Sequence, residues 1–330
     1  MRMITEFAAF AVGFAVSLLS MPMIMKVMKR KGIMGVDVHK KDRPSIPEMG
    51  GIAVLLGITA SVLTAVLLMP GRDRLLVSFL SSTLIAGVIG AVDDLKTLNA
   101  KIKPFLTLFS SIPILLLGTY NPRGPILPII GQTRLTLVYP FVIVVAMAVT
   151  SNAVNMMDPF NGTMSGTCTV ITIVLVVSSL ILGRYDGVLP SLCILGPLLV
   201  LYFYNKYPAK VFSGDVGSLS IGAALGAASI ISRLEIVAVV AFAPQIMNAF
   251  YGLSTIGRLY ERREVPRPVI LLENGKLMAA SDPNAPITLA RLILARGPLH
   301  EREAAQVFII LSIISGVLAV FTAYLIRVTV

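Results

Sequence analysis

The chain has 330 residues, of which 56% are hydrophobic and only 14% are charged, with a formal net charge of +11. Soluble domains carry about 25% charged residues, and apolar runs long enough to cross a ~30 Å hydrocarbon core recur along this chain. The composition therefore excludes an ordinary soluble protein and predicts an all-α polytopic integral membrane protein. The loop bias of membrane proteins explains the basic charge without nucleic acid as a partner.

Hydropathy predicts about ten transmembrane helices. Their expected ranges are 4–25, 50–69, 76–92, 105–118, 137–151, 166–183, 189–205, 217–231, 235–257 and 306–327. The first run is too long for the apolar part of a signal peptide and is followed by further spans, so it is interpreted as a helix. Cys168 and Cys193 fall inside predicted spans and are expected to be small core residues.

The distribution of basic residues predicts the orientation. With the N-terminus outside, 20 of the 28 lysines and arginines fall in inner loops, and every lysine is among them. The basic residues of the outer segments are all arginines. These inner loops are residues 26–49, 93–104, 152–165, 206–216 and 258–305. The positive-inside rule then predicts a cytosolic face for these loops and both termini on the outer face.

The first inner loop contains "HKKDRPSIPEMGG". Glu48 precedes the glycine pair that opens the second span, where it could cap the helix or contribute to a site. His39 in this loop and His300 in the last loop are the two histidines of the chain. A lone histidine in a basic loop is more often structural than catalytic.

The third span ends in "GAVDDLKTLNAKIKP". Asp93 and Asp94 are neighbouring carboxylates at a membrane boundary, where like charges are unfavourable unless a cation compensates them. Lys103 follows shortly afterwards. A solvated loop with acid–base pairs and a functional site are both compatible with this pattern.

The fifth span ends in "SNAVNMMDPFNG", in which Asn152, Asn155, Asp158 and Asn161 fall at every third position. Asp158 precedes a proline, so the helix is expected to end there. Asn152 and Asn155 lie on one side of the helix end, and their amide oxygens suit a hard cation. Ordinary loop chemistry is the alternative for each residue alone.

The stretch "KVFSGDVGSLSIG" places Asp215 between glycines, directly before an apolar helix. The simpler interpretation is an aspartate that caps the helix. The functional one is a carboxylate at a tight turn, where the small glycines let a metal or ligand approach.

The last inner loop, residues 258–305, is the longest and carries a basic cluster that includes Arg258, Arg262, Arg263 and Arg267. Arginine forks suit phosphate oxygens, although a basic flank is also expected beside any inner loop. Acidic residues, amides and cations thus converge on one membrane face. This combination predicts metal-assisted phosphoryl transfer between a soluble diphosphate and a lipid. A secondary transporter or flippase and a non-catalytic lipid-binding scaffold are the competing classes.

The motifs "DDLKTLNAKIK", "NAVNMMDPFNG" and "FSGDVGSLSIG", in this order, resemble those of the polyprenyl-phosphate N-acetylhexosamine-1-phosphate transferases. Ten spans with both ends outside also fit that family. The resemblance implies a single transmembrane catalytic domain over residues 1–330, with residues 258–305 as a long cytosolic loop or small subdomain. It also implies a UDP-sugar, a polyprenyl phosphate and Mg²⁺, with Mn²⁺ as an alternative, and it leaves a homodimer open.

The resemblance further implies roles for particular residues. Asp215 and Asn155 are expected to hold Mg²⁺ against the donor diphosphate, and Asp93 and Asp94 to lie near the acceptor phosphate. Lys103 is expected to bind phosphate. Glu48 and Asn161 are expected to meet the nucleoside, and an arginine of the last inner loop is expected to meet the diphosphate, with Arg262 and Arg263 as the best matches and Arg267 as an alternative. Asn152 and Asp158 are the remaining expected substrate-binding residues.

The stretches "IPEMGG" and "GPLHERE" favour the branch that transfers N-acetylglucosamine-1-phosphate to dolichyl phosphate, the first step of lipid-linked glycan assembly. Thr97 and Asp158 depart from that branch and leave UDP-MurNAc-pentapeptide open as the donor. The expected location is the plasma membrane or an equivalent of the endoplasmic reticulum, with the site on the cytosolic face.

Overall fold

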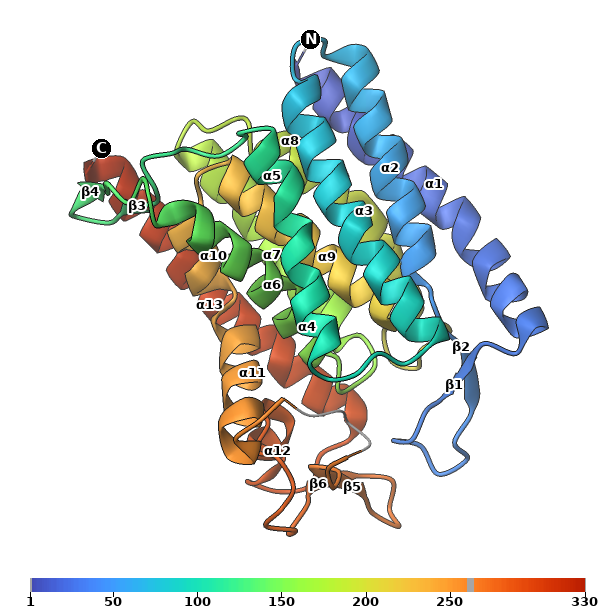
Figure 1. Cartoon of the computed structure of the whole chain (residues 1–330). Helices are drawn as coiled ribbons and strands as arrows, with labels where there is room; N and C mark the ends of the chain where they lie inside the picture. Colours follow the sequence, from blue (N-terminus) through green and yellow to red (C-terminus); the bar gives the residue numbers. More distant parts are fainter. Residues whose placement is uncertain (1, 260–263, 330) are drawn as a thin grey trace.

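The computed structural model describes residues 2–259 and 264–329, which form a bundle of long helices with three short hairpins outside it (Figure 1). Eight described helices are long and apolar enough to cross a membrane, or nine if the bent pair α10–α11 counts as one span. The prediction of an all-α polytopic membrane protein is confirmed. The eight are α1 (Arg2–Lys31), α2 (Gly51–Leu68), α3 (Asp73–Leu95), α6 (Tyr139–Met156), α7 (Thr163–Ile181), α8 (Val188–Asn205), α9 (Gly214–Ile231) and α13 (Glu301–Thr329).

The predicted fourth span is a short, interrupted helix. It consists of α4 (Ile102–Thr107), the 3-10 helix η1 (Leu108–Ser111) and α5 (Ile112–Leu116). Fifteen residues reach only about 22 Å as a helix. Pro113 lacks the N–H that would bond to the carbonyl of Phe109, and its ring crowds that carbonyl. The interrupted helix nevertheless runs along α3 from end to end. Lys103 at its beginning pairs with Asp93 near the end of α3, and Thr119 just after it bonds to Ser78 near the beginning of α3.

The predicted span 235–257 is bent by 65° between α10 (Glu235–Ala241) and α11 (Ala243–Ile256). Pro244 in the first turn of α11 cannot donate to the carbonyl of Val240, four residues earlier. That carbonyl instead accepts a hydrogen bond of 2.6 Å from the Ser315 hydroxyl of α13. The expectation of a continuous helix was wrong here, and the proline is the physical reason.

Helix α9 is the centre of the bundle. In the apolar stretch of α9, 89% of the residues are buried, against 22% in that of α1. Small residues let neighbouring backbones approach closely, as is typical of membrane helices. A Cβ atom on Gly90 of α3 would lie 2.3 Å from the carbonyl oxygen of Asp215, and one on Gly222 would lie 2.6 Å from the Cα of Ser151 in α6.

The end of the bundle where α3 ends and α9 begins is here called the site end, and the opposite end the far end. The beginning of α1 and the end of α13 both lie at the far end (Figure 1). The side of the membrane that each end faces stays a prediction. Two antiparallel hairpins lie at the site end, formed by β1 (Met34–Val36) with β2 (Ser45–Pro47) and by β5 (Val269–Leu271) with β6 (Leu277–Ala279). The far end carries β3 (Ile126–Leu127) with β4 (Gly131–Gln132).

The segment between α11 and α13 packs on the site end. Its hairpin β5–β6 and helix α12 (Leu289–Leu294) share a hydrophobic cluster with Phe160, from the loop after α6, and with Phe308 of α13. The two phenylalanine rings meet edge to face at 5.9 Å. The segment is thus anchored to the bundle, while its description as a separate small subdomain stays a prediction.

Candidate active site

Two helix ends bring the predicted carboxylates together. Asp93 and Asp94 are in the last turn of α3, and Asp215 is in the first turn of α9. The two helices run in opposite directions and pack closely at Gly90, so the end of one meets the beginning of the other. Residues more than a hundred positions apart in the sequence therefore meet at one point.

Asp94 binds the beginning of α9. Its Oδ1 accepts from the backbone N–H of Asp215 at 2.7 Å, and its Oδ2 accepts from the N–H of Val216 at 2.9 Å. The first N–H groups of a helix lack partners inside the helix, and a carboxylate there is favoured by the helix dipole. Gly214 has φ of +67° and leaves no room for a Cβ, which would lie 2.6 Å from Asp94 Oδ2. Asp94 thereby fixes the position of Asp215.

We expect Asp94→Ala to lower both stability and turnover, because two amides of α9 lose their acceptor. Loss of such a cap destabilises a protein by about 1–2 kcal/mol, and Asp94→Asn, which keeps one acceptor, should fall in between. The apparent melting temperature in detergent micelles measures the effect. Asp73→Ala, in the exposed first turn of α3, is the matched control. Equal melting temperatures for Asp94→Ala and Asp73→Ala would contradict the capping role.

Lys103 bridges the other two carboxylates. Its Nζ lies 2.8 Å from Asp93 Oδ2 and is also hydrogen-bonded to Asp215 Oδ2. The second oxygen of Asp93 accepts from the backbone N–H of Leu98 at 2.5 Å. Both oxygens of Asp93 therefore have donors, and the ammonium group marks a position where a cation is stabilised between two acids.

Asn155, in the last turn of α6, completes this cluster. Its Nδ2 donates to Asp215 Oδ1 at 2.6 Å and to the Ser218 hydroxyl at 2.8 Å. Asp93, Asp215 and Asn155 offer only oxygen ligands, which hard cations such as Mg²⁺ prefer. Together with the ammonium group already held there, this donor set fits the expected metal. We call Asp93, Asp94, Lys103, Asn155 and Asp215 the acidic cluster.

Glu48 faces the acidic cluster from the hairpin before α2. Its carboxylate lies over Gly35 of β1, where a Cβ would be 2.3 Å from Oε1. Burial, together with the negative charge of Asp215, raises the pKa of the Glu48 carboxyl above its ordinary value. The structure thus brings Glu48 near the metal-binding candidates.

Asp158 and Asn152 support the cluster from its edge. Asp158 Oδ2 accepts from the Ser213 hydroxyl at 2.9 Å, which ties the loop after α6 to the residues that enter α9. Asn152 donates to the Thr107 hydroxyl at 2.7 Å and to the Ala148 carbonyl at 2.8 Å. Asn152 therefore braces α6 against α4.

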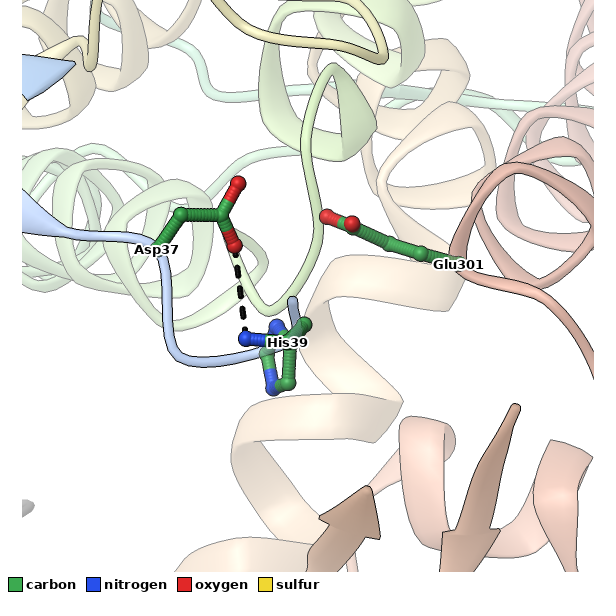
Figure 2. A group of neighbouring side chains, drawn as sticks. All are labelled: Asp37, His39 and Glu301. Atoms are coloured by element: carbon green, nitrogen blue, oxygen red, sulfur yellow. Dashed lines mark hydrogen bonds between the residues drawn. The ribbon is translucent and has the colours of Figure 1, made fainter. Parts of the chain in front are cut away.

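Asn161 is buried in a second polar group. Its backbone N–H donates to Glu301 Oε1 at 3.0 Å, and its Nδ2 donates to Asp37 Oδ2 at 2.9 Å. Lys40 pairs with both acids, at 3.4 Å from Glu301 Oε2. Figure 2 shows the Glu301 carboxylate directed toward Asp37 and His39, and one ligand atom from each of these three residues lies within 4.8 Å of the others.

The sequence motifs did not identify Asp37, Lys40 or Glu301 as partners of Asn161. They come from the first inner loop and from the beginning of α13, and neither stretch carries a local signal for contact with the loop after α6. Three segments far apart in the sequence are joined only by the fold.

None of the described arginines of the last inner loop forms an ion pair with the acidic cluster. Arg262 and Arg263 lie outside the described residues. Arg267 is exposed just before β5 and forms no ion pair with the carboxylates among residues 2–259 and 264–329. Their expected role at a diphosphate stays a prediction.

Comparison with known proteins identifies relatives. The model of glycosyl transferase family 4 matches residues 76–233, which include all five members of the acidic cluster. A protein of Sulfolobus acidocaldarius is 31% identical over 66% of this chain and 69% of its own length. Its provisional name is UDP-N-acetylglucosamine–dolichyl-phosphate N-acetylglucosaminephosphotransferase.

Two further relatives match over a similar or larger share of this chain. A provisionally named glycosyltransferase of Methanocaldococcus jannaschii is 31% identical over 87% of this chain and 86% of its own length. A phospho-N-acetylmuramoyl-pentapeptide-transferase of Streptococcus pyogenes is 32% identical over 69% of this chain and 73% of its own length.

Proposed function

The chain belongs to glycosyl transferase family 4 and is a sugar-phosphate transferase to polyprenyl phosphate, and we propose that its donor is UDP-N-acetylglucosamine. The acceptor is dolichyl phosphate or another polyprenyl phosphate. The products are UMP and a lipid-linked N-acetylglucosamine diphosphate. The observation that carries the transfer reaction is the acidic cluster, in which α3, α4, α6 and α9 deliver carboxylates, an amide and an ammonium group to one end of a membrane bundle. The choice of N-acetylglucosamine is supported by the name of the Sulfolobus acidocaldarius relative.

In the proposed reaction, an oxygen of the lipid phosphate attacks the phosphorus that carries the sugar. The new phosphorus–oxygen bond forms as the bond to the UMP oxygen breaks, and UMP leaves with that electron pair. A phosphate monoester has a second pKa near ~6, so the acceptor is mostly dianionic at neutral pH and needs no base. Transfer then depends on positioning and charge neutralisation.

The hydrogen bonds of Asp93 and Asp94 support direct attack. All four carboxylate oxygens already accept from Leu98, Lys103 or the first amides of α9. Asp94 orients Asp215, and Asp93 orients Lys103, whose ammonium group we expect to bind a phosphate oxygen. Asp215 and Asn155 would hold Mg²⁺, which when bound neutralises negative charge on the donor diphosphate.

A two-step route, in which an aspartate first attacks the donor phosphorus, is the alternative mechanism. Incubation of the enzyme with UDP-sugar and Mg²⁺ without lipid phosphate distinguishes them. Direct attack predicts no UMP above the rate of hydrolysis. A burst of UMP equal to the amount of enzyme would refute direct attack.

The donor sugar is tested by supplying UDP-N-acetylglucosamine and UDP-MurNAc-pentapeptide separately, with the same polyprenyl phosphate, and measuring UMP. We expect turnover with the first donor only. Turnover with the pentapeptide donor alone would assign the chain to the alternative substrate. The positive-inside distribution of lysines supports a cytosolic location of this reaction.

Glu301 is proposed as a positioning residue for the donor, since Asn161 is the residue expected to meet the nucleoside. Glu301→Leu removes the acceptor of the Asn161 N–H. We expect the KM for UDP-sugar to rise about tenfold, with kcat changed far less. The hydrogen bond between the Asn161 N–H and the charged Glu301 contributes energy of that order, and without it Asn161 is no longer held in position. Glu303→Leu, at an acid that accepts from His300 instead, is the control. A fall in kcat with unchanged KM would contradict this role.

A further inference from the structure

The far end of the bundle has an unusual basic composition. The positive-inside rule depletes lysine and arginine from outer segments, yet the predicted outer segments contain eight arginines and no lysine. They are Arg2, Arg72, Arg74, Arg123, Arg134, Arg184, Arg233 and Arg327. The proposed transfer reaction at the site end uses none of them.

Three of these arginines line one cavity of about 610 Å³ at the far end. Its walls come from the beginning of α3, the segment after α5, the loop between α7 and α8, and the end of α9 with the residues that follow it. The polar lining residues include Arg72, Arg74, Thr119, Asn121, Asp186 and Arg233. The cavity therefore lies at the opposite ends of the same two helices, α3 and α9, that carry the acidic cluster.

Positive charge in the cavity exceeds negative charge. Arg72 pairs with Asp186 at 2.7 Å, so one arginine is compensated. Arg74 is exposed and forms no hydrogen bond or ion pair with the described residues. Arg233 donates to the neutral Gln132 side chain at 2.6 Å. The nearby Glu235 accepts from Tyr139 and does not line the cavity, but its carboxylate lies within electrostatic reach of Arg184 and Arg233. Arg74 is therefore the arginine of the cavity with no acid paired to it among the described residues.

Arg233 is fixed in place before any ligand arrives. Its φ of +59° is uncommon for a residue other than glycine. The Arg184 guanidinium donates to its carbonyl, and the next residue, Leu234, donates to the Ser229 carbonyl at 2.8 Å. Burial and the positive charge of Arg233 lower the pKa of Arg184. The fold thus holds two guanidinium groups close together at this end.

We propose that this cavity binds the phosphate group of an anionic membrane lipid, at the end of the bundle opposite to the transfer reaction. Guanidinium forks match phosphate oxygens in pairs, which explains arginine in place of lysine. The hydroxyl of Thr119 and the amide of Asn121 offer further donors. Leu68 and Leu116, at the ends of α2 and α5, are 53% and 79% exposed and offer apolar surface to acyl chains.

Titration of the purified full-length protein in detergent, followed by native mass spectrometry, tests this site. The probes are dioctanoyl phosphatidate, dioctanoyl phosphatidylcholine and inorganic phosphate. We expect one phosphatidate to bind at the far end more tightly than the other two probes. Arg74→Gln, alone and combined with Arg233→Gln, should weaken it by about tenfold or more, because a hydrogen bond to a charged group is lost. Arg123→Gln, outside the cavity, is the matched control.

Phosphatidate could also occupy the acceptor position at the site end, so Lys103→Gln is included and should leave the far-end binding unchanged. Equal affinity of wild type and Arg74→Gln for phosphatidate would overturn the site. Equal affinity of the protein for inorganic phosphate and phosphatidate would contradict the proposal that the bound phosphate group belongs to a lipid. Retained transfer activity in Arg74→Gln shows that the variant is folded, and the outcome is independent of the donor sugar.

Discussion

Asp215→Asn is expected to reduce the transfer of sugar phosphate by about a thousandfold, the upper range for loss of a charge that stabilises a transition state. The asparagine has the same shape and can still accept from Asn155, while the Asp94 contacts are to backbone amides and remain. What is lost is the negative charge shared between Lys103 and the expected Mg²⁺. Initial rates of UMP formation at saturating substrates measure the effect.

The control for this substitution is Asp186→Asn, at an acid of the far end that pairs with Arg72. It removes the same charge away from the cluster and should leave the rate within about twofold, since exposed ion pairs contribute little. An unchanged melting temperature for Asp215→Asn would separate chemistry from folding. Turnover of Asp215→Asn equal to that of the control would refute the metal assignment.

Lys103→Gln is expected to reduce the rate by about a hundredfold, as removal of one positioned donor does in other enzymes. Glutamine leaves Asp93 and Asp215 without the ammonium group between them. Without that ammonium group the two carboxylates repel each other. A divalent cation should therefore stabilise the variant more than it stabilises the wild type. We expect Mg²⁺ to raise the melting temperature of Lys103→Gln by more than that of the wild type.

Lys101→Gln is the matched control, because this lysine precedes the same helix and has no ion pair with a described residue. It should behave like the wild type in both measurements. If Mg²⁺ shifted the melting temperatures of Lys103→Gln and wild type equally, Lys103 and the metal would not share the two carboxylates.

Much of the acidic cluster was predictable because its residues lie at helix ends that hydropathy locates. Asp93, Asn155 and Asp215 each end or begin an apolar run, and the alternation of spans places all three at one end. The sequence suggested that Asp215 caps its own helix. In the structure the cap of α9 comes from Asp94 on α3, a contact across 121 positions that no local pattern contains.

The interrupted helices were less predictable. Pro113 and Pro244 are visible in the sequence, but apolar length alone treated both segments as simple spans. Their effect depends on what satisfies the freed carbonyls, such as Ser315 of α13 at Val240. The group around Asn161 was missed for the same reason. Asp37 and Glu301 become partners of Asn161 only when the fold brings the first inner loop and α13 together.

The competing transporter interpretation placed its polar residues along a path through the membrane. The acidic cluster instead lies at one end of the bundle, and the chain belongs to glycosyl transferase family 4. The scaffold interpretation requires a degenerate site, whereas the acids, the amide and the lysine are in mutual contact. A homodimer and the choice between plasma membrane and endoplasmic-reticulum equivalent stay predictions.

One labelling measurement tests the central claim most directly. UDP-N-acetylglucosamine labelled with ³²P at the phosphorus next to the sugar is incubated with the protein, polyprenyl phosphate and Mg²⁺, and the lipid and aqueous phases are separated. Transfer of sugar phosphate predicts that the label enters the lipid phase in equal amount to the unlabelled UMP released, and that Asp215→Asn abolishes both. Label that stays in the aqueous phase while the sugar enters the lipid would contradict the account.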